Sequence, residues 1–566
     1  MKSVPFISYF ILLPLQVLFA QTVTPLSPVL LQKLDSVATQ DVPSDAPGIA
    51  TAIIQNGEVV YQKWAGIADF ADSSLITADT RFNIASNGKQ FTALAILTLM
   101  DAGKLKLSDD IRTFFPKLFP RIKEKISIRH LLTHSSGIRD VYDLWSLQGF
   151  TWWKQSFNNN DVLALLTKQE ELNFAPGSKY LYSNSNYILL ALLVEKLSGQ
   201  SFTTYTNNLF RMLGMYATSF EDNYNNIRGP VARAYFNFNT WTTYNWIWNV
   251  CGDGNLFSTL NDQLQWERIV QGKVVTPVST ATIQKSQQLV EQSAVTNYGY
   301  GLEFGNYKGL AYTFHEGATG AWKATVLRFP EKKVAMITLT NTGKSIPAMQ
   351  TRQMADLFFK LNTETQSWLT APARAGSYVD EKELTGIYLT GNDFAFEFEI
   401  RNGKLYLKRN GRNDIELERE SHNVFHQKND PAFKQEFVKN AKGEMQVTAY
   451  YTTHAPYTLV RATANWNRFN YAALNGTYRN NETNTLLEIT GTSGRNYAVV
   501  LAGKDSSTAV LVTPDKLLMN NYSINLVKTG TGNIELHLNS DRIKLVKFVK
   551  LRGRYISQDT PTILRR

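Results

Sequence analysis

Ser86 and Lys89 are the first residues in the sequence whose types and spacing could do chemistry. They stand three positions apart in the segment FNIASNGKQFTALAIL, a spacing that places both side chains on one face of a helix. A serine hydroxyl becomes a nucleophile when a base takes its proton, and lysine is such a base only when neutral. The ordinary lysine pKa of about 10.4 leaves roughly one side chain in 2,500 neutral at pH 7. The pair therefore requires a site that lowers this pKa by desolvation or a neighbouring cation.

Two further segments offer groups for the same chemistry. Tyr182 could pass a proton and Asn184 could hold a substrate amide, although Tyr-Ser-Asn alone is a common turn before a helix. His315 stands in an expected strand, where a single histidine is usually structural, and Gly317 would let a substrate backbone approach closely. The sequence has no GxGxxG loop, no Walker phosphate loop, no HExxH zinc helix and no GxSxG elbow. Serine chemistry is therefore the leading interpretation.

The elements that must position these residues form a mixed α/β region. Apolar residues at helical spacing predict a helix over 85–102. Two β-rich runs around Asn56-Gly57 predict a hairpin over 48–68, and three more strands are expected over 310–342. Because strands open and close the region, we expect one antiparallel sheet built from both ends, with helices packed on it. Further helices are expected over 161–169, 185–197 and 346–361.

The last third of the chain has a different pattern. After a polar stretch with Pro372, the segment FAFEFEIRNGKLYLKRNG (394–411) alternates apolar and polar residues around Asn402-Gly403, and a second Asn-Gly pair follows at 410–411. This part also looks duplicated. The similar segments are ELTGIY (383–388) with ALNGTY (473–478), and YTLVR (457–461) with IKLVK (543–547). The pattern predicts two small all-β barrels of one type.

The composition is that of an ordinary globular protein, with 43% hydrophobic and 19% charged residues. Lys and Arg number 59 against 48 Asp and Glu, a formal charge of +11, and residues 371–566 hold 27 basic and 20 acidic residues, a surplus of 7. A basic tail favours anionic partners such as cell-wall polymer, although solvated barrel surface is the simpler account. No run of like charge indicates nucleic acid. Cys251 is the only cysteine, and no Cys/His spacing predicts a metal or cofactor site.

The first twenty residues are typical of a signal peptide. Lys2 precedes the apolar stretch Pro5–Ala20, and cleavage is expected after Ala20. That stretch is shorter than the roughly 20 apolar residues that cross a bilayer, and no other stretch is long enough. The sequence therefore predicts a secreted or periplasmic protein without a transmembrane segment in its mature form.

Three segments resemble, in their order and context, those of the penicillin-recognising serine hydrolases. They are the segments that hold Ser86 with Lys89, Tyr182 with Asn184, and His315 with Gly317. That family includes class C β-lactamases, D-alanyl-D-alanine carboxypeptidases, D-aminopeptidases and related esterases. The resemblance runs from Gly48 to Thr342. Supporting stretches are IRHLLTHSSG (128–137), FAPG (174–177), LGM (213–215) and GNLFST (254–259), the last followed by Asp262 and Trp266. The resemblance implies a β-lactamase-like α/β (α+β) catalytic domain, with an antiparallel sheet flanked by helices and a helical subdomain.

The resemblance also implies roles for individual residues. Ser86 resembles the acylated nucleophile and Lys89 its general base. Tyr182 resembles the proton-transferring tyrosine of a YxN motif, and Asn184 its substrate-binding asparagine. The backbone N–H groups of Ser86 and Ala318 would form the oxyanion hole.

His315 departs from the commonest family pattern, because many members carry Lys there in a Lys-Thr-Gly motif. The His-x-Gly version, completed by Gly317, resembles the D-aminopeptidase and esterase branch. We expect His315 to titrate near neutral pH, so that activity falls as its charge changes. Glu316 would either repel a substrate carboxylate or recognise a free amine. His130 and His134 match a family stretch without a catalytic role and are expected to be structural.

The layout resembles that of D-aminopeptidases, in which two lipocalin-like barrels follow the catalytic domain and a barrel loop can reach the cleft. The expected division is a signal peptide over 1–20, a catalytic domain over 21–365, a linker over 366–382, and barrels over 383–465 and 466–566. The expected function is a serine hydrolase acting on amide or ester bonds of small peptide-like substrates. The alternatives are β-lactamase or carboxylesterase activity of the same site, or a non-catalytic module that binds or senses the cell wall.

Overall fold

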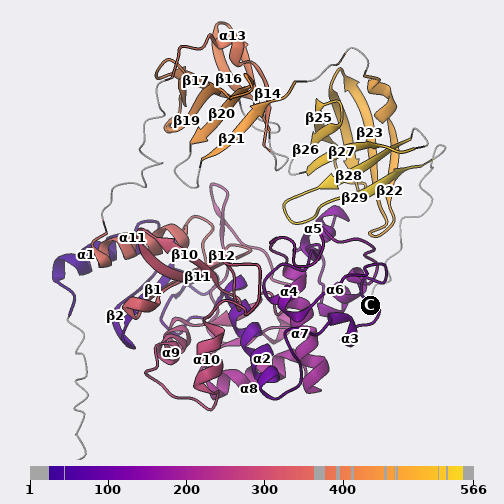
Figure 1. Cartoon of the computed structure of the whole chain (residues 1–566). Coiled ribbons are helices and arrows are strands. Elements are labelled where there is room, and N and C mark those ends of the chain that lie inside the picture. Colours follow the sequence, from indigo (N-terminus) through magenta and orange to yellow (C-terminus); the bar gives the residue numbers. More distant parts are fainter. Residues whose placement is uncertain are drawn as a thin grey trace, which may run out of the picture.

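The computed structural model describes residues 25–43, 45–361, 376–390, 395–408, 414–450, 456–463, 466, 469–519, 522–530 and 533–551. The expected signal peptide, most of the expected linker and the Asn-Gly pair at 410–411 lie outside these residues. The described chain folds into an α/β region, which we call the α/β domain, followed by two barrels (Figure 1). In these ranges, no helix has the length and apolar character that crossing a membrane requires.

One six-stranded antiparallel sheet organises the α/β domain. In sheet order, its strands are β10 (Glu303–Tyr307), β11 (Leu310–Thr319), β12 (Trp322–Phe329), β13 (Val334–Thr340), β1 (Ile49–Gln55) and β2 (Glu58–Ala65). Strand β1 pairs with β13 in one continuous register, from Ile49 opposite Thr340 to Gln55 opposite Val334. The prediction of a single antiparallel sheet built from both ends of the region is therefore confirmed.

The β1–β2 connection forms as its sequence predicts. Asn56 has φ 52° and Gly57 has φ 78°. A two-residue hairpin turn with positive φ at both central positions matches the twist of the flanking strands, and Asn-Gly is the pair that adopts it most readily.

Two helices, α1 (Pro28–Thr39) and α11 (Pro347–Phe359), cover one face of the sheet (Figure 1). Their Leu34 and Met354 share a buried apolar cluster with Met336 of β13. Alternate residues of the central strands face the other way, because side chains on a strand point to opposite faces in turn. Those residues join the larger core that lies among the remaining helices.

Two central helices dominate that larger core. Helix α2 (Lys89–Asp101) and helix α7 (Asn184–Ser198) are buried along most of their length, which is typical of helices enclosed by other elements. The other helices are α3 (Ile111–Phe114), α4 (Ile128–Leu132), α5 (Val141–Leu147), α6 (Asn159–Leu166), α8 (Phe202–Met212), α9 (Leu260–Val270) and α10 (Thr280–Ser286). The short strands are β3 (Ile67–Asp69), β4 (Ser74–Leu75), β5 (Phe82–Asn83), β6 (Ser219–Phe220), β7 (Phe236–Asn237), β8 (Trp241–Thr242) and β9 (Leu256–Ser258).

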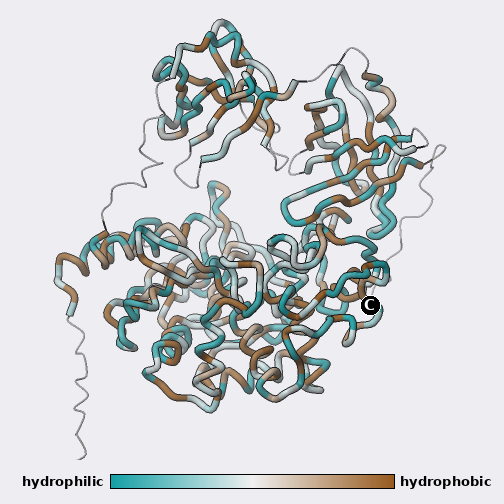
Figure 2. Tube along the Cα trace, viewed as in Figure 1, coloured by the Kyte–Doolittle hydropathy of each residue, from teal (hydrophilic) through white to brown (hydrophobic). Residues whose placement is uncertain are grey.

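The described residues after 375 form two closed eight-stranded antiparallel barrels, which confirms the prediction of two small all-β barrels. The first barrel has β14 (Gly386–Leu389), β15 (Ala395–Arg401), β16 (Lys404–Lys408), β17 (Ile415–Arg419), β18 (Val424–Gln427), β19 (Asp430–Lys439), β20 (Met445–Tyr450) and β21 (Tyr457–Arg461), preceded by the short helix α13 (Glu381–Leu384). The second has β22 (Gly476–Asn480), β23 (Thr485–Ser493), β24 (Asn496–Leu501), β25 (Ser507–Thr513), β26 (Lys516–Met519), β27 (Tyr522–Lys528), β28 (Ile534–Asn539) and β29 (Val546–Lys550). Hydrophobic and hydrophilic residues alternate along the barrel strands (Figure 2). The hydrophobic side chains therefore point inward and fill the barrel interior.

The duplication is visible in one repeated contact. Tyr388 donates its hydroxyl to the carbonyl of Leu384 at 3.0 Å, and Tyr478 donates to the carbonyl of Leu474 at 2.9 Å. Both tyrosines are fully buried at the start of their barrels, and both acceptors lie four residues earlier at the end of a short helix. The two similar sequence segments therefore build the same corner twice.

Candidate active site

The nucleophile candidate lies on a tight turn between β5 and α2. The expected helix over 85–102 begins instead with a 3-10 turn, Ala85–Gly88, and the α-helix starts at Lys89. Ala85 has φ 49°, a conformation that is unfavourable for a residue with a Cβ. Its N–H donates to Oδ1 of buried Asn83 at 3.0 Å, which helps to hold the strained turn. The turn leaves Ser86 partly exposed while the residues beside it are buried.

Strand β11 passes directly beside this turn at Gly317. A Cβ on Gly317 would lie 2.3 Å from the carbonyl oxygen of Ile84 and 3.1 Å from the amide nitrogen of Ser86. The glycine is therefore required for contact between the strand and the nucleophile turn. This reason differs from the expectation that Gly317 makes room for a substrate backbone.

Lys89 is fully buried and directed at Ser86. Its Nζ donates to Oγ of Ser86 at 3.1 Å and to Oδ1 of Asn184 at 3.0 Å, and it also donates to the backbone carbonyl of Asp253. Burial lowers the pKa of Lys89 to about 7, against the opposing charge of Asp253 and with the help of the Arg542 cation. The site thus supplies what the Ser-x-x-Lys pair requires, a lysine that is largely neutral above pH 7.

Asn184 holds Lys89 in place from the start of α7. Its backbone N–H and its Nδ2 both donate to Oδ2 of Asp140, at 2.7 and 2.9 Å, while its Oδ1 faces Lys89. The side chain of Asp140 is completely buried, and its Oδ1 caps α5 by accepting from the N–H of Tyr142 at 2.9 Å. The amide that was expected to bind substrate therefore makes its recorded contacts inside the protein.

Tyr182 lies against the same lysine. Nζ of Lys89 is 4.8 Å from the centre of the Tyr182 ring. The Tyr182 hydroxyl is buried and meets hydrogen-bond geometry with no group in the described part of the chain. Burial raises its pKa well above the ordinary value, and the nearby Ser86 hydroxyl offsets part of that rise. Tyr182 is thus protonated at neutral pH, with a hydroxyl free for a partner in the site.

His315 is held by two contacts inside the protein. Its Nδ1 lies 2.8 Å from the carbonyl of Glu316, which can only accept, so Nδ1 carries the proton. Its Nε2 then accepts from the hydroxyl of Tyr298 at 3.1 Å. Burial, together with the charge of Lys89, lowers the pKa of His315 to about 3. The expectation that His315 titrates near neutral pH is therefore wrong, because the folded chain removes this side chain from water.

The residues beside His315 and Tyr182 have structural contacts as well. Glu316 forms an ion pair with Arg352 of α11 at 2.7 Å. His134 is fully buried, its Nδ1 accepts from the N–H of Ser183 at 3.2 Å, and its ring centre is 4.3 Å from that of Tyr182. His134 therefore packs against the Tyr182 ring and does not line the cavity.

A cavity of about 740 Å³ opens in front of these groups. Ser86, Tyr182, Asn184, His315, Gly317 and Ala318 all line it. Lys89 does not line it but lies directly beneath Ser86. The structure thus brings all seven candidate residues together in one place. Among the residues that the structure describes, no group of three His, Cys, Asp or Glu side chains could hold a metal ion.

Comparison with known proteins agrees with this geometry. Residues 34–359 match the family described as Beta-lactamase. The chain belongs to the beta-lactamase family. The resemblance inferred from the motifs is thereby confirmed, and this family member is a serine hydrolase.

Curated relatives match more than half of the sequence of this beta-lactamase family member. "Protein flp" from Staphylococcus aureus (strain MRSA252) is 27% identical over 410 residues, which are 67% of this chain and 77% of that protein. A D-aminopeptidase from Brucella anthropi is 26% identical over 359 residues, 61% of this chain and 66% of that protein. The octameric penicillin-binding protein homologue from Pyrococcus abyssi shares the fold, with a TM-score of 0.54 and 24% identity over 76% of this chain and 99% of that chain.

The second barrel of this family member reaches the cavity through the loop between β28 and β29. Arg542 on this loop lines the cavity, and its guanidinium carbon is 4.9 Å from the centre of the Tyr182 ring. The backbone of Arg542 is fixed at both ends, since its N–H donates to Asp143 at 3.0 Å and its carbonyl accepts from Asn173 at 3.0 Å. The loop is therefore part of the cavity wall.

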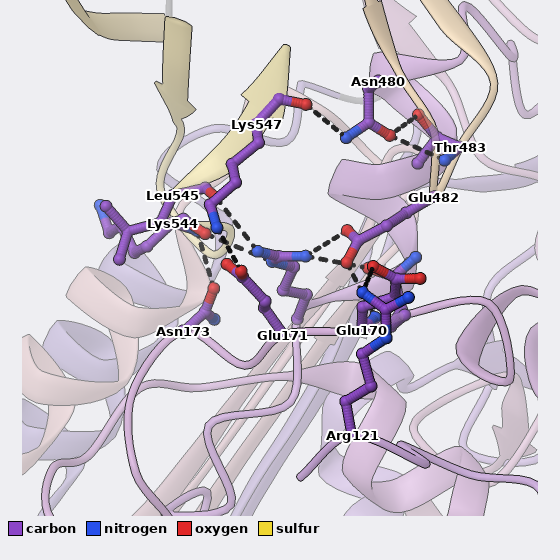
Figure 3. Close-up of polar contacts among 12 residues, drawn as sticks. Arg121, Glu170, Glu171, Asn173, Asn480, Glu482, Thr483, Lys544, Leu545 and Lys547 are labelled. Atoms are coloured by element: carbon purple, nitrogen blue, oxygen red, sulfur yellow. Dashed lines mark hydrogen bonds and ion pairs between the residues drawn. The ribbon is translucent and has the colours of Figure 1, made fainter. Parts of the chain in front are cut away.

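Polar contacts anchor this loop and the neighbouring turn to the α/β domain (Figure 3). Arg139, whose side chain is 1% exposed, forms an ion pair with Glu482 and donates to the carbonyls of Lys544 and Leu545 at 3.2 Å each. The N–H of Glu170 donates to Glu482 at 2.8 Å. Arg139 is therefore buried between the α/β domain and the second barrel, with its guanidinium bonded to both the turn and the loop.

Sequence reasoning missed three residues that complete the site. The buried carboxylate of Asp140 accepts from Asn184, the backbone carbonyl of Asp253 accepts from Lys89, and Arg542 comes from a barrel loop. Asp140 directly follows the IRHLLTHSSGIR stretch and Arg542 directly precedes the duplicated IKLVK segment. The resemblance implied that a barrel loop could reach the cleft, but neither neighbourhood singles out Asp140 or Arg542, because only the folded chain brings these two residues together.

Proposed function

We propose that this protein forms an acyl-enzyme on Ser86 and hydrolyses amide or ester bonds of small peptide-like substrates. The observation that carries the proposal is the 3.1 Å contact between Oγ of Ser86 and Nζ of Lys89, whose pKa lies near 7. A general base works best when its pKa is close to the working pH. The similarity to a D-aminopeptidase supports amides of D-amino acids as the first substrates to examine.

The proposed reaction has two halves. Lys89 takes the hydroxyl proton as Oγ of Ser86 bonds to the substrate carbonyl carbon, and the carbonyl oxygen becomes an oxyanion. The intermediate collapses, the bond to the leaving amine or alcohol breaks, and the leaving group receives a proton through Lys89 and Tyr182. A water molecule then attacks the acyl carbon, giving the acid and restoring the Ser86 hydroxyl.

The oxyanion is proposed to accept hydrogen bonds from the backbone N–H groups of Ser86 and Ala318. Both residues line the cavity, and the contact at Gly317 holds β11 against the Ser86 turn. One such donor lowers the barrier by about 3–4 kcal/mol in serine proteases of other folds. His315 is proposed to position Tyr298 and the β11 backbone, since both of its ring nitrogens are engaged inside the protein.

We also propose that the protein is exported. Lys2 and the apolar stretch Pro5–Ala20 support this, with cleavage after Ala20. Fractionation of cells that express the full chain tests it, together with N-terminal sequencing of the product. A cytoplasmic product that begins at Met1 would contradict it.

Covalent labelling tests the acyl-enzyme. An alkyl fluorophosphonate should add to Ser86 in the wild-type chain, as located by mass spectrometry of the tryptic peptide. Ser86→Ala should abolish labelling, whereas Ser198→Ala, a change at the far end of α7, should leave it unchanged. Absence of any Ser86 adduct with fluorophosphonates and with a fluorescent penicillin would refute the proposal.

A further inference from the structure

Seven aromatic side chains form much of the cavity wall next to the nucleophile. They come from two separate segments that the fold brings together, one around α5 and one after β8. The seven are Tyr142, Trp145, Phe150, Trp152, Phe157, Trp246 and Trp248. We call them the aromatic wall.

The half of the aromatic wall nearest α5 is tightly packed. Trp145 stacks on Phe157 with ring centres 4.2 Å apart, and it meets Trp248 edge to face at 5.8 Å. Trp145 and Trp248 are 5% and 8% exposed. Packing of this kind fixes the rings before any ligand arrives, which lowers the ordering cost of binding.

The other half lies beside the end of β11. Trp246 donates its Nε1 hydrogen to Asn255 at 3.0 Å, and its ring centre is 5.8 Å from that of Trp152. Gly320 faces both rings, and a Cβ there would lie 3.8 Å from Trp246 and 3.9 Å from Trp152. Because Gly320 follows the proposed oxyanion residue Ala318 by two positions, this half of the wall is continuous with the reaction centre.

The aromatic surface continues toward solvent. Trp153, which is 40% exposed, and Tyr244, which is 37% exposed, pack against each other and against Trp152. Large apolar side chains that remain exposed at a concave site mark a surface for binding an apolar ligand.

We propose that the aromatic wall is a binding subsite for a flat aromatic group, or one of similar apolar bulk, carried by the substrate next to its scissile carbonyl. The inference rests on the proposed Ser86 acyl-enzyme and adds the class of substituent that this site selects. Aromatic rings favour stacked or edge-to-face contacts with one another, and burial of an apolar group against fixed rings removes both surfaces from water.

A fluorophosphonate series tests the subsite without an aromatic leaving group. The probes carry methyl, benzyl or naphthylmethyl on phosphorus, fluoride leaves in every case, and the second-order rate of Ser86 labelling is measured. The aryl probes should react about ten-fold or more faster than the methyl probe. Trp152→Ala and Phe150→Ala should each lower the aryl rate several-fold more than they lower the methyl rate, and Trp64→Ala on β2 serves as the distant control.

The outcomes separate the two proposals. Labelling of Ser86 by all probes at equal rates would overturn the subsite and leave the acyl-enzyme standing. Equal losses for methyl and aryl probes in both wall variants would also overturn the subsite, because a general structural defect affects every probe. Labelling by none of the probes would overturn the proposed function. Binding can also be measured without a reaction, by adding N-acetyl naphthylalanine amide to the Ser86→Ala variant and following its tryptophan fluorescence. Quenching of this fluorescence that becomes weaker when Trp152→Ala is added would support the subsite independently of reactivity.

Discussion

Arg542 of the second barrel pairs with Asp140 of the α/β domain, with a guanidinium nitrogen 3.8 Å from a carboxylate oxygen. Asp140 accepts two hydrogen bonds from Asn184, and Asn184 in turn accepts from Lys89. A continuous set of polar contacts therefore leads from the barrel loop to the proposed base. The barrel also contributes a positive charge that acts on that base.

Arg542→Gln should move the pH dependence of Ser86 labelling to higher pH. The Arg542 cation helps to lower the pKa of Lys89, so its removal lets that pKa rise. A rise of the pKa from about 7 to about 8 would lower the neutral fraction of Lys89 at pH 7 from roughly one half to roughly one in eleven. Labelling rates between pH 5 and 10 measure the shift. Arg542→Lys should keep the wild-type midpoint, and an unchanged midpoint in Arg542→Gln would exclude the electrostatic effect.

Labelling of the wild-type protein should rise through a single midpoint near pH 7. The pKa of Lys89 is lowered to about 7 by burial, and Ser86 becomes reactive as Lys89 loses its proton. His315, with a pKa of about 3, stays neutral over this range. His315→Gln should therefore lower the rate without moving the midpoint. A second midpoint between pH 5 and 8 that disappears in His315→Gln would contradict this assignment.

Lys89→Met should remove a pH-dependent part of the stability. The folded pKa of Lys89 is about 7 and its unfolded value about 10.5, so the unfolded chain binds more protons between these limits. The free energy of unfolding therefore rises with pH across this window, by up to about 1.4 kcal/mol per unit from this group, and the penalty is fully present below pH 7. Urea unfolding of both chains at pH 7, 8 and 9 gives the difference. A parallel pH dependence in both would refute the assigned burial cost.

Glu482→Gln should weaken the docking of the second barrel. Glu482 pairs with Arg139, and removing one member of a buried ion pair typically costs about 3–5 kcal/mol because the other charge remains buried. Hydrogen exchange of the 540–545 loop should increase, and Ser86 labelling should fall. Lys547→Ala breaks the neighbouring exposed pair with Glu171, which should cost less than about 1 kcal/mol. Equal effects of the two variants on exchange and labelling would show that the buried Arg139–Glu482 pair contributes no more to docking than the exposed Lys547–Glu171 pair.

Substrates with a free amine should bind better above pH 7. Glu303 lines the cavity, and burial, with a further contribution from the charge of Glu316, raises its pKa to about 7. KM for an aminoacyl amide should fall severalfold between pH 6 and 8, while KM for its N-acetyl derivative should stay level. Glu303→Gln should remove the difference. The same pH dependence of KM for both substrates would rule out recognition of an amine by Glu303.

The parts of the structure that depend on local sequence could be predicted, and the parts that depend on burial could not. Asn56-Gly57 determines its turn within two residues, and a spacing of three brings Lys89 within reach of Ser86, although Asn184 and the backbone of Asp253 then hold the lysine. The expectation that His315 titrates near neutral pH was wrong, because its pKa is lowered by burial and by the charge of Lys89, which depend on the folded chain. Whether the proposed roles of Ser86 and Lys89 hold is decided by labelling.

Asn184 shows the same limit in another way. Its position before α7 is evident from the sequence, but its partners Lys89 and Asp140 lie on different elements. Family likeness gave Asn184 a substrate-binding role, whereas the structure records contacts that hold the lysine. A sequence motif predicts which side chains lie at the site. The residues that each of these side chains contacts are known only from the folded structure.

Ser86 and Arg542 stand near opposite ends of the chain, yet they line one cavity. A ribosome therefore completes the nucleophile turn long before it has added the hairpin that carries the arginine. A nascent or prematurely terminated chain that lacks this hairpin holds Ser86 and Lys89 but neither the cation nor that part of the cavity wall. The order of synthesis makes the last strands of the second barrel the final step in assembling the reaction centre.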